Sequence, residues 1–155
     1  MSIRHAENRD IGRLIDLLHQ VLEVHASGRG DLFQSGTTKY SEAELESMIK
    51  DEKTPIFVLE DETGTVQGYV MCQMEDVESP NMVKHRNLYI DDICVDASCR
   101  RKHYGNRLYE FVKAYARSIG AYHITLNVWN CNPDAIAFYE KLGMKPMKTV
   151  MEEIL

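Results

Sequence analysis

The chain has 155 residues, and 24 acidic against 18 basic side chains give it a formal net charge of −6 at pH 7. This balance disfavours a general nucleic-acid-binding protein, which needs a broad basic surface, and no apolar run approaches the roughly 20 residues of a membrane-spanning helix. The N-terminal residues carry charges where a signal peptide needs an apolar segment. We therefore expect one domain over residues 1–155, located in the cytoplasm and without a nucleic-acid or membrane partner.

The first third of the chain predicts one strand and two helices. Residues 3–6 are the expected strand, and apolar side chains then recur at helical spacing over residues 11–25, before a glycine-rich break at 27–30. Residues 41–50 start with a serine that is followed three residues later by a glutamate, which is the spacing of a capping box. A second, short helix is therefore predicted there.

The middle of the chain predicts three strands. Residues 56–59 are apolar and run into Glu60, so 56–60 is expected to be a buried strand, and a turn at 61–64 leads into a second strand over 66–74, so the two should form a hairpin. A loop at 79–81 separates this hairpin from a third strand over 87–95. Strands connected by such short turns pair antiparallel.

The last third predicts two helices and two strands. An amphipathic helix is expected over 104–119, and alternating apolar residues predict a strand over 122–129. Asn132, followed by a proline, has the character of a helix N-cap, and the last helix should close before Gly143. Residues 144–155 are expected to form a final strand.

The predicted order is β-α-α-β-β-β-α-β-α-β, an α/β chain of the α+β type in one domain. Helices between strands indicate a central mixed, mostly antiparallel sheet flanked by helices. The strand–helix–strand unit over residues 87–129 must cross over, so its two strands should be parallel.

Four cysteines are scattered along the chain, and none forms a CxxC pair or has a histidine at zinc spacing. Isolated cysteines in a cytoplasmic protein are typically reduced thiols. The sequence therefore predicts neither disulfides nor a metal site. The four are Cys72, Cys94, Cys99 and Cys131.

A basic turn joins the third middle strand to the amphipathic helix. It contains Arg100, Arg101, Lys102 and His103 and ends at Gly105. Backbone N–H groups at a helix N-terminus lack intrahelical partners, and the helix dipole favours an anion such as phosphate. On its own, a basic turn before a helix is more often a solvated surface than a binding site.

Two separate segments resemble one family signature. Residues 93–105 look like the strand end and loop of the GCN5-related N-acetyltransferases, with Arg100 and Gly105 at the first and last loop positions and His103 where that family has a glycine. Residues 132–144 match the family pattern Asn-x-x-Ala-x-x-Phe-Tyr-x-x-x-Gly, with methionine in place of a closing phenylalanine. The resemblance implies that fold over essentially the whole chain and acetyl-CoA as co-substrate.

The resemblance also implies which residues contact acetyl-CoA. The strand-end amides are expected along its acetyl-pantetheine arm, and the turn around its pyrophosphate. His103 either donates to a phosphate or, with strain at positive φ, weakens binding. Asn132 is a helix N-cap on sequence grounds, and the resemblance adds a contact to the arm. The expected set is Ile93, Cys94, Val95, Arg100, Arg101, Lys102, His103, Tyr104, Gly105, Asn106 and Asn132.

Two residues are candidates for proton transfer. Tyr139 matches the family tyrosine that protonates the leaving thiolate, although its helical spacing also fits simple packing. Asp91 lies where family members carry the base that deprotonates the amine, directly or through water, although a salt-bridged carboxylate would look the same. Neighbours in a strand point to opposite faces, so Asp92 is expected on the other face together with Leu88, Ile90 and Cys94, where it would satisfy a helix end or an internal hydrogen bond.

The resemblance implies that the end of the first helix and the loop after it help to form the acceptor pocket. His25 lies on the apolar face of that helix, which favours a satisfied buried histidine over a substrate contact. Asp31 suits a cationic amine or a role in fixing the glycine turn, and Phe33 follows it.

The sequence supports an N-acetyltransferase that moves an acetyl group from acetyl-CoA to a primary amine, directly within a ternary complex. The acceptor is expected to be a small molecule or a peptide amine. A non-catalytic acyl-CoA-binding sensor with the same fold is the alternative. A nucleotide-binding domain ranks last because the turn lacks the glycine-rich patterns of those proteins. An edge strand near the C-terminus predicts pairing between subunits and hence a homodimer.

Overall fold

A computed structural model describes residues 1–155. Its single sheet has five strands in the order β1-β2-β3-β4-β5. Two short 3-10 turns, at Asn8–Asp10 and Ala97–Cys99, precede α1 and α3. The strands and helices are β1 (Ser2–His5), α1 (Ile11–Gly28), α2 (Glu42–Lys50), β2 (Ile56–Glu60), β3 (Val66–Ser79), β4 (Met82–Val95), α3 (Tyr104–Ser118), β5 (His123–Leu126) and α4 (Pro133–Lys141).

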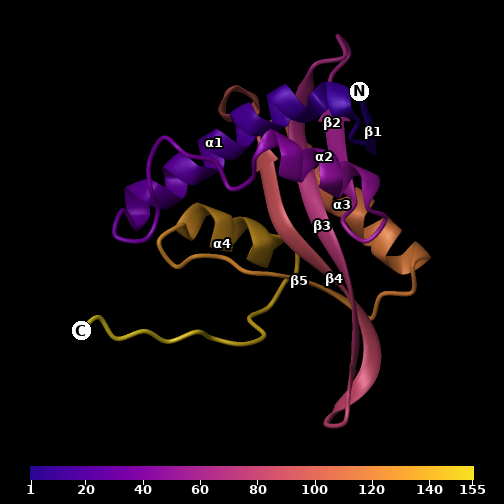
Figure 1. The fold of residues 1–155 in the computed structure, drawn as a ribbon, viewed down its shortest axis with the longest axis vertical. Coiled ribbons are helices and arrows are strands. Elements are labelled where there is room, and N and C mark those ends of the chain that lie inside the picture. The colour runs from indigo at the N-terminus through magenta and orange to yellow at the C-terminus, as the bar shows by residue number, and fades with distance from the viewer.

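The strand pairing confirms the predicted mixed sheet. The first four strands are antiparallel neighbours, and β5 pairs with β4 in parallel after the crossover through α3. Figure 1 shows β3 and β4 continuing as a long hairpin that leaves the body of the domain. Both strands are longer than predicted because the expected loop at 79–81 is a tight turn inside one ladder.

Two apolar cores lie on opposite faces of the sheet. Along β2, Phe57 and Leu59 face α3, whereas Ile56 and Val58 face α1 and α2. This explains the unbroken apolar run of the strand, because a strand covered on both faces has no polar side. Helices α1 and α2 thus form one layer and α3 another, with the sheet between them.

An irregularity in β4 changes which residues share a face. Ile90 pairs with Cys72 and Asp92 with Met71, so Asp91 is an extra residue with no partner, a β-bulge. As a result, Ile90 lies in the core beside α3 while Cys94, four residues later, lies in the core beside α1. The predicted common face of Asp92, Ile90 and Cys94 is therefore wrong.

The helix boundaries follow the capping signals. Ser41 Oγ accepts the Glu44 N–H at 3.2 Å, and the Glu44 carboxylate accepts the Ser41 N–H at 2.7 Å, which confirms the predicted capping box. Asn132 caps α4 through a bond from the Ala135 N–H. None of the helices combines the length and the apolar character that crossing a lipid bilayer requires.

The end of the chain differs from the prediction. Residues 142–155 form no helix or strand, so the expected final strand over 144–155 is absent. A strand needs a partner, and no element of the fold pairs with this segment, however suitable its side chains. The predicted strand over 122–129 shortens to β5 for the same reason, because pairing with β4 ends at Leu126.

Candidate active site where β4 and β5 separate

The sheet opens between β4 and β5. Their parallel pairing joins Asn87–Ile90 to His123–Leu126, and there β5 ends while β4 runs on to Val95. No backbone hydrogen bond joins Asp91–Val95 to the chain that follows Leu126. The backbone of Ile93, Cys94 and Val95, the predicted contacts of the cofactor arm, therefore lies along an open strand edge that can bind an extended chain.

The basic turn follows this edge directly. Residues 100–106 offer seven consecutive N–H groups, and none of them has a hydrogen-bond acceptor in the protein. The turn ends where α3 begins, so the positive end of the helix dipole is added to these donors. Such a row of free amides is an anion-binding concavity.

The backbone conformation of the turn is unusual for its residue types. Arg101 has φ 69° and His103 has φ 59°, so both side chains sit in the left-handed region that favours glycine. Arg100, Arg101 and Lys102 are exposed and form no ion pair. The histidine at the family glycine position thus keeps the backbone shape of a glycine, and three cations remain free around the seven amides.

Gly105 serves helix packing as well as the turn. A Cβ at this position would lie 3.0 Å from Phe138 Cζ, tighter than almost all Cβ contacts, so Phe138 would have to shift. The absence of a side chain therefore lets the start of α3 rest on α4 at Phe138. Because Tyr139 follows directly, this contact ties the anion-binding turn to the predicted general acid.

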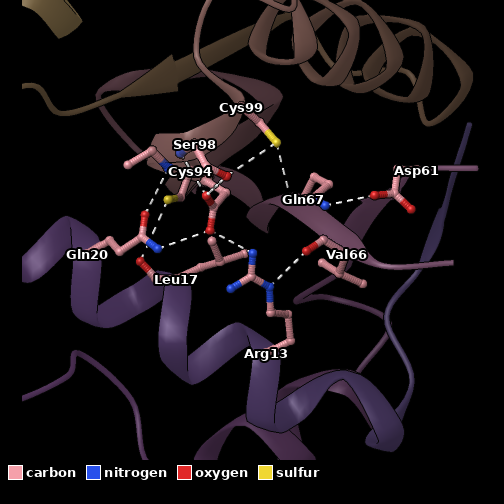
Figure 2. Close-up of polar contacts among 11 residues, drawn as sticks. Arg13, Leu17, Gln20, Asp61, Val66, Gln67, Cys94, Ser98 and Cys99 are labelled. Carbon is pink, nitrogen blue, oxygen red and sulfur yellow. Dashed lines mark hydrogen bonds and ion pairs between the residues drawn. The ribbon is translucent and has the colours of Figure 1, made fainter. Parts of the chain in front are cut away.

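A carboxylate anchors the start of the turn to two other elements. Asp96 accepts bonds from the Ser98 N–H (2.8 Å), the Ser98 hydroxyl (2.5 Å), the Arg13 guanidinium (2.6 Å) and the Gln20 amide (3.1 Å). Arg13 also donates to the Val66 carbonyl, so α1, β3 and the turn meet here (Figure 2). These bonds, first that of the Ser98 hydroxyl and then that of Arg13, hold the pKa of Asp96 well below its usual range.

Replacing this carboxylate by an amide should destabilise the protein. Hydrogen bonds to charged groups contribute about 1.5–3 kcal/mol, and Asp96→Asn loses the charge that several donors share, so we expect a loss of about 2–3 kcal/mol in urea unfolding. A carboxylate whose pKa is lowered on folding stabilises the protein at every pH above its unfolded pKa of about 3.9. This stabilisation is lost only as the pH falls below that value. The deficit should therefore stay constant between about pH 5 and 8, whereas a deficit that varied in this window would contradict the assignment.

Tyr139 lies half-buried at the same end of the sheet. Burial first, and then the nearby charges of Asp92 and Cys94, raise the pKa of its hydroxyl well above the usual value. The hydroxyl therefore keeps its proton at neutral pH and is available as a donor. Of the two carboxylates, Asp92 is the one whose charge contributes to the raised pKa of Tyr139.

Asp92, which follows Asp91 in β4, has a strongly shifted pKa. Burial raises the pKa of Asp92 to about 6, and the Asp91 charge adds to this rise, while Lys39 and a hydrogen bond from Tyr69 oppose it. Tyr69 Oη lies 3.2 Å from Asp92 Oδ2. A carboxylate with this pKa is ionised at neutral pH but binds a proton far more readily than an ordinary aspartate.

Asp91 is held by the loop between α1 and α2. Lys39 Nζ lies 3.0 Å from its carboxylate, and the Tyr40 hydroxyl donates to the other carboxylate oxygen. This bond and burial raise the pKa of Tyr40, burial being the larger cause. Because of the bulge, Asp91 and Asp92 both project toward the α1 side, so the expectation that they face opposite ways is wrong.

The predicted acceptor residues come together with one more aromatic side chain. The rings of His25 and Phe33 are 5.0 Å apart, and Trp129 completes the cluster at 5.1 Å from Phe33. Burial, and then Lys39, lower the pKa of His25, so it is neutral at pH 7. Asp31 instead pairs with Arg29 at 2.8 Å, which supports its role in fixing the glycine turn.

Several site residues carried no signal in the sequence. Lys39 and Tyr40 lie in a loop without a motif, and Trp129 was expected as the last residue of a strand, with no role in the site. Tyr89, whose hydroxyl accepts a bond from the Asn127 amide, is likewise placed by the sheet alone. No three His, Cys, Asp or Glu side chains lie close enough together to hold a metal ion.

Comparison with known proteins places this geometry in a family. The model described as "Acetyltransferase (GNAT) family" matches residues 18–144. Glucosamine 6-phosphate N-acetyltransferase from Arabidopsis thaliana is 32% identical over 92 residues, and the alignment spans 57% of this chain and 57% of that enzyme, little more than half its length.

Solved structures extend the similarity to the whole chain. A mutant of the BH1408 protein from Bacillus halodurans is 31% identical and superposes with a TM-score of 0.96, covering 100% of this chain and 99% of that one. The crystal structure of the Arabidopsis thaliana glucosamine-6-phosphate N-acetyltransferase is 25% identical with a TM-score of 0.69, over 99% of this chain and 97% of that one.

Proposed function

Since the chain belongs to the acetyltransferase (GNAT) family, we propose that it is an N-acetyltransferase that moves an acetyl group from acetyl-CoA to a primary amine. The observation that carries this proposal is the continuity of the open edge at Ile93–Val95 with the seven free N–H groups of residues 100–106. An acyl-CoA has the matching order of parts, an amide-bearing arm followed by a pyrophosphate. Residues 1–155 would act as one domain.

The residues present fit the expected donor. The free amides and the three exposed cations of the turn suit a pyrophosphate, and the edge of β4 suits the amides of the pantetheine arm. Tyr104, which starts α3 and is buried, and Asn106, which is exposed, are two of the residues whose N–H groups are free. The side-chain oxygen of Asn132 already caps α4. Its predicted contact with the pantetheine arm would therefore have to come from its remaining polar groups.

The transfer itself requires one proton to leave the amine and one to reach the sulfur. The neutral amine attacks the thioester carbon, a C–N bond forms, and the C–S bond breaks to give the amide and a thiol. Tyr139 is proposed to donate to the sulfur as negative charge develops there. The proton of the amine goes to the carboxylate pair at the bulge, through Asp91 as predicted from the sequence or through Asp92.

The contacts of the two carboxylates favour different roles. Asp91 is engaged by Lys39 and Tyr40, which position the loop over the acceptor side. Asp92 has the raised pKa and the neighbouring Tyr139 that a proton acceptor in this reaction needs. Asp92 is therefore the second candidate for the base, and the assignment to Asp91 stays a prediction.

The acceptor side favours an amine with a flat or apolar body. Trp129, Phe33 and neutral His25 form an aromatic wall, and the amine proposed to bind there would present its nitrogen to Asp91 or Asp92. Glucosamine 6-phosphate, the substrate named for the Arabidopsis relative, offers a phosphate, whereas Lys39 near this wall is already paired with Asp91. Aromatic and apolar amines should therefore be tested beside the amino sugar.

Thiol release from acetyl-CoA tests the proposal. Wild-type protein is assayed with a panel of aromatic amines, aliphatic amines, peptide N-termini and glucosamine 6-phosphate, and without any amine, while calorimetry on the same sample measures acetyl-CoA binding. Saturable, amine-dependent release supports the transferase. Binding without release for every amine would favour the non-catalytic sensor, and absence of binding would refute both.

The unusual histidine of the turn yields a separate prediction. His103→Gly removes a side chain from the left-handed region, so the protein should gain up to about 1 kcal/mol of stability. If the backbone amides hold the ligand, the Kd of acetyl-CoA should change less than about twofold. Arg101→Gly is the matched variant, because it relieves the same backbone conformation at φ 69° but removes a cation and should weaken binding. A tenfold loss in His103→Gly would instead assign phosphate binding to the histidine ring.

A further inference from the structure

One lysine of the chain lies where the amine of an acceptor is expected. Lys39 Nζ lies 3.0 Å from the Asp91 carboxylate and 3.1 Å from the Asp91 carbonyl oxygen. Asp91 is the first residue of β4 after its pairing with β5 ends at Ile90, so it stands at the start of the open edge. A primary amine of the protein itself is thus held at a carboxylate that the proposed reaction offers to the amine of a substrate.

The order of the binding elements directs the thioester of the donor to the same place. The turn over residues 100–106 follows the C-terminal end of β4, and the open edge leads from it back through Val95 and Ile93 to Asp92 and Asp91. A donor whose pyrophosphate binds at the turn and whose arm follows the edge therefore brings its thioester to the bulge. This placement of the donor rests on the proposed function.

The loop between α1 and α2 (Figure 1) carries Lys39 and is held on both sides of it. On one side, the Glu23 carboxylate of α1 accepts bonds from the Ser35 hydroxyl and the Gly36 N–H, each at 2.7 Å. On the other side, the Tyr40 hydroxyl donates to the same carboxylate that Lys39 contacts. Because the backbone is fixed in this way, the amine is held beside the open edge, and a nucleophile held beside its target reacts as if at high local concentration.

The contact between Lys39 and Asp91 can open without disrupting the fold. The side chain of Lys39 is 44% exposed, whereas that of Asp91 is 8% exposed. Asp91 keeps the hydrogen bond from Tyr40 when Lys39 leaves. The lysine can therefore move from the carboxylate to a thioester beside it, or give up its place to the amine of a substrate.

We propose that Lys39 is an acetylation site, modified by the acetyl-CoA bound to its own chain when no acceptor amine occupies the site. Nζ first gives one proton to the carboxylates at the bulge and becomes neutral. Its lone pair then forms a C–N bond to the thioester carbon, and the C–S bond breaks with its electron pair on sulfur. The nitrogen releases a second proton and the sulfur takes one, so the products are acetyl-lysine, the thiol of coenzyme A and one proton in solution.

The acetyl group changes the site that it enters. It removes the positive charge of Lys39 and with it the ion pair with Asp91. Burial raises the pKa of Asp92, and the Lys39 charge opposes this rise, so loss of that charge leaves Asp92 with a greater affinity for protons. Acetylation thus releases the loop from Asp91 and makes the neighbouring carboxylate a stronger base.

Mass spectrometry of the full chain, after incubation with acetyl-CoA and without any amine, tests the proposal. Lys84 is the matched control, because it is also paired with a carboxylate but is more exposed, at 75%, and lies on the β3–β4 hairpin that leaves the domain. Spontaneous acetylation would favour Lys84, whereas Lys39 should gain its acetyl group at least about tenfold faster if it reacts within the site. The rate per chain should not depend on protein concentration, and excess coenzyme A should slow it by competing for the edge and the turn.

A variant and a substrate separate the reaction from mere proximity. Lys39→Arg keeps a cation for Asp91 but replaces the amine by a guanidinium that stays protonated. This variant should bind acetyl-CoA with the Kd of wild type in calorimetry, yet take up at least about tenfold less acetyl group into the protein. In wild type, any amine that supports thiol release should protect Lys39, because both compete for the same place.

The outcomes distinguish this inference from the proposed function. If acetyl-CoA binds and an amine is acetylated, but Lys39 reacts no faster than Lys84, the inference is overturned and the proposed function stands. Acetylation of Lys39 at a rate that rises with protein concentration would show transfer between molecules and would also overturn it. Absence of acetyl-CoA binding in calorimetry would refute the proposed function and the inference together.

Discussion

Tyr139→Phe should lower kcat for amine acetylation about 10²–10⁴-fold while the Kd of acetyl-CoA stays within about twofold of wild type, because general acid catalysis contributes about this much. The substitution removes only the hydroxyl, whose pKa is raised by burial and by Asp92 so that it remains a proton donor. The ring keeps its packing, so the fold and the binding edge are preserved. Steady-state kinetics and calorimetry on the same preparation measure both quantities.

The matched control is the neighbouring aromatic residue. Phe138→Leu disturbs the packing of α4 on Gly105 and should affect stability and acetyl-CoA binding before it affects the chemical step. If Tyr139→Phe kept full activity, the tyrosine would be a packing residue and the proton would reach the sulfur by another route. If it lost binding as well as turnover, its role would be structural.

Asp92→Asn should make the protein more stable and much less active. The pKa of Asp92 is about 6 in the folded protein against an ordinary 3.8. The folded state thus binds this proton more tightly than the unfolded state, so Asp92 lowers stability increasingly as pH rises from about 4 to 6, and by a constant amount above that. Replacing the carboxylate by an amide removes this destabilisation, which is on the order of 2–3 kcal/mol at pH 7.5. The Tm should therefore rise by about 5 °C or more.

The same substitution separates the two candidate bases. If Asp92 accepts the proton of the amine, kcat/KM of wild type should fall below about pH 6, and Asp92→Asn should lose about 10²-fold or more at neutral pH. Asp91→Asn breaks the contacts with Lys39 and Tyr40, so it should destabilise the protein and mainly raise the KM of the amine. The reverse pattern, with catalysis lost in Asp91→Asn and kept in Asp92→Asn, would assign the base to Asp91.

Local patterns predicted most of the fold because local physics determines most of its elements. Strand β2 has its predicted bounds, since a short apolar run followed by a turn is typical of a strand covered on both faces. The α2 capping box and the α4 cap at Asn132 formed as the side-chain spacing indicates. The basic turn could be proposed as an anion site from the sequence because a basic turn, a strand end and a second motif appear in order.

The remaining differences arise from contacts between segments far apart in the sequence. The bulge at Asp91 depends on the register between β3 and β4, which no local pattern of β4 reveals, and it decides how both carboxylates point. Lys39 and Tyr40 join the site only because their loop folds back onto β4. The final strand is absent for a related reason, since its side-chain pattern is suitable but no strand of the fold pairs with this segment.

The extra residue in β4 also shows that a small change in sequence is enough to create such a site. With Asp91 removed, Ile90 would still lie opposite Cys72 and Asp92 opposite Met71, and every apolar side chain on either side would keep its present face. The sheet therefore does not need Asp91, and a one-residue insertion is enough to set a second acid beside the first. A site built this way changes its number of acids by gain or loss of a single codon, while the hydrophobic core keeps its packing.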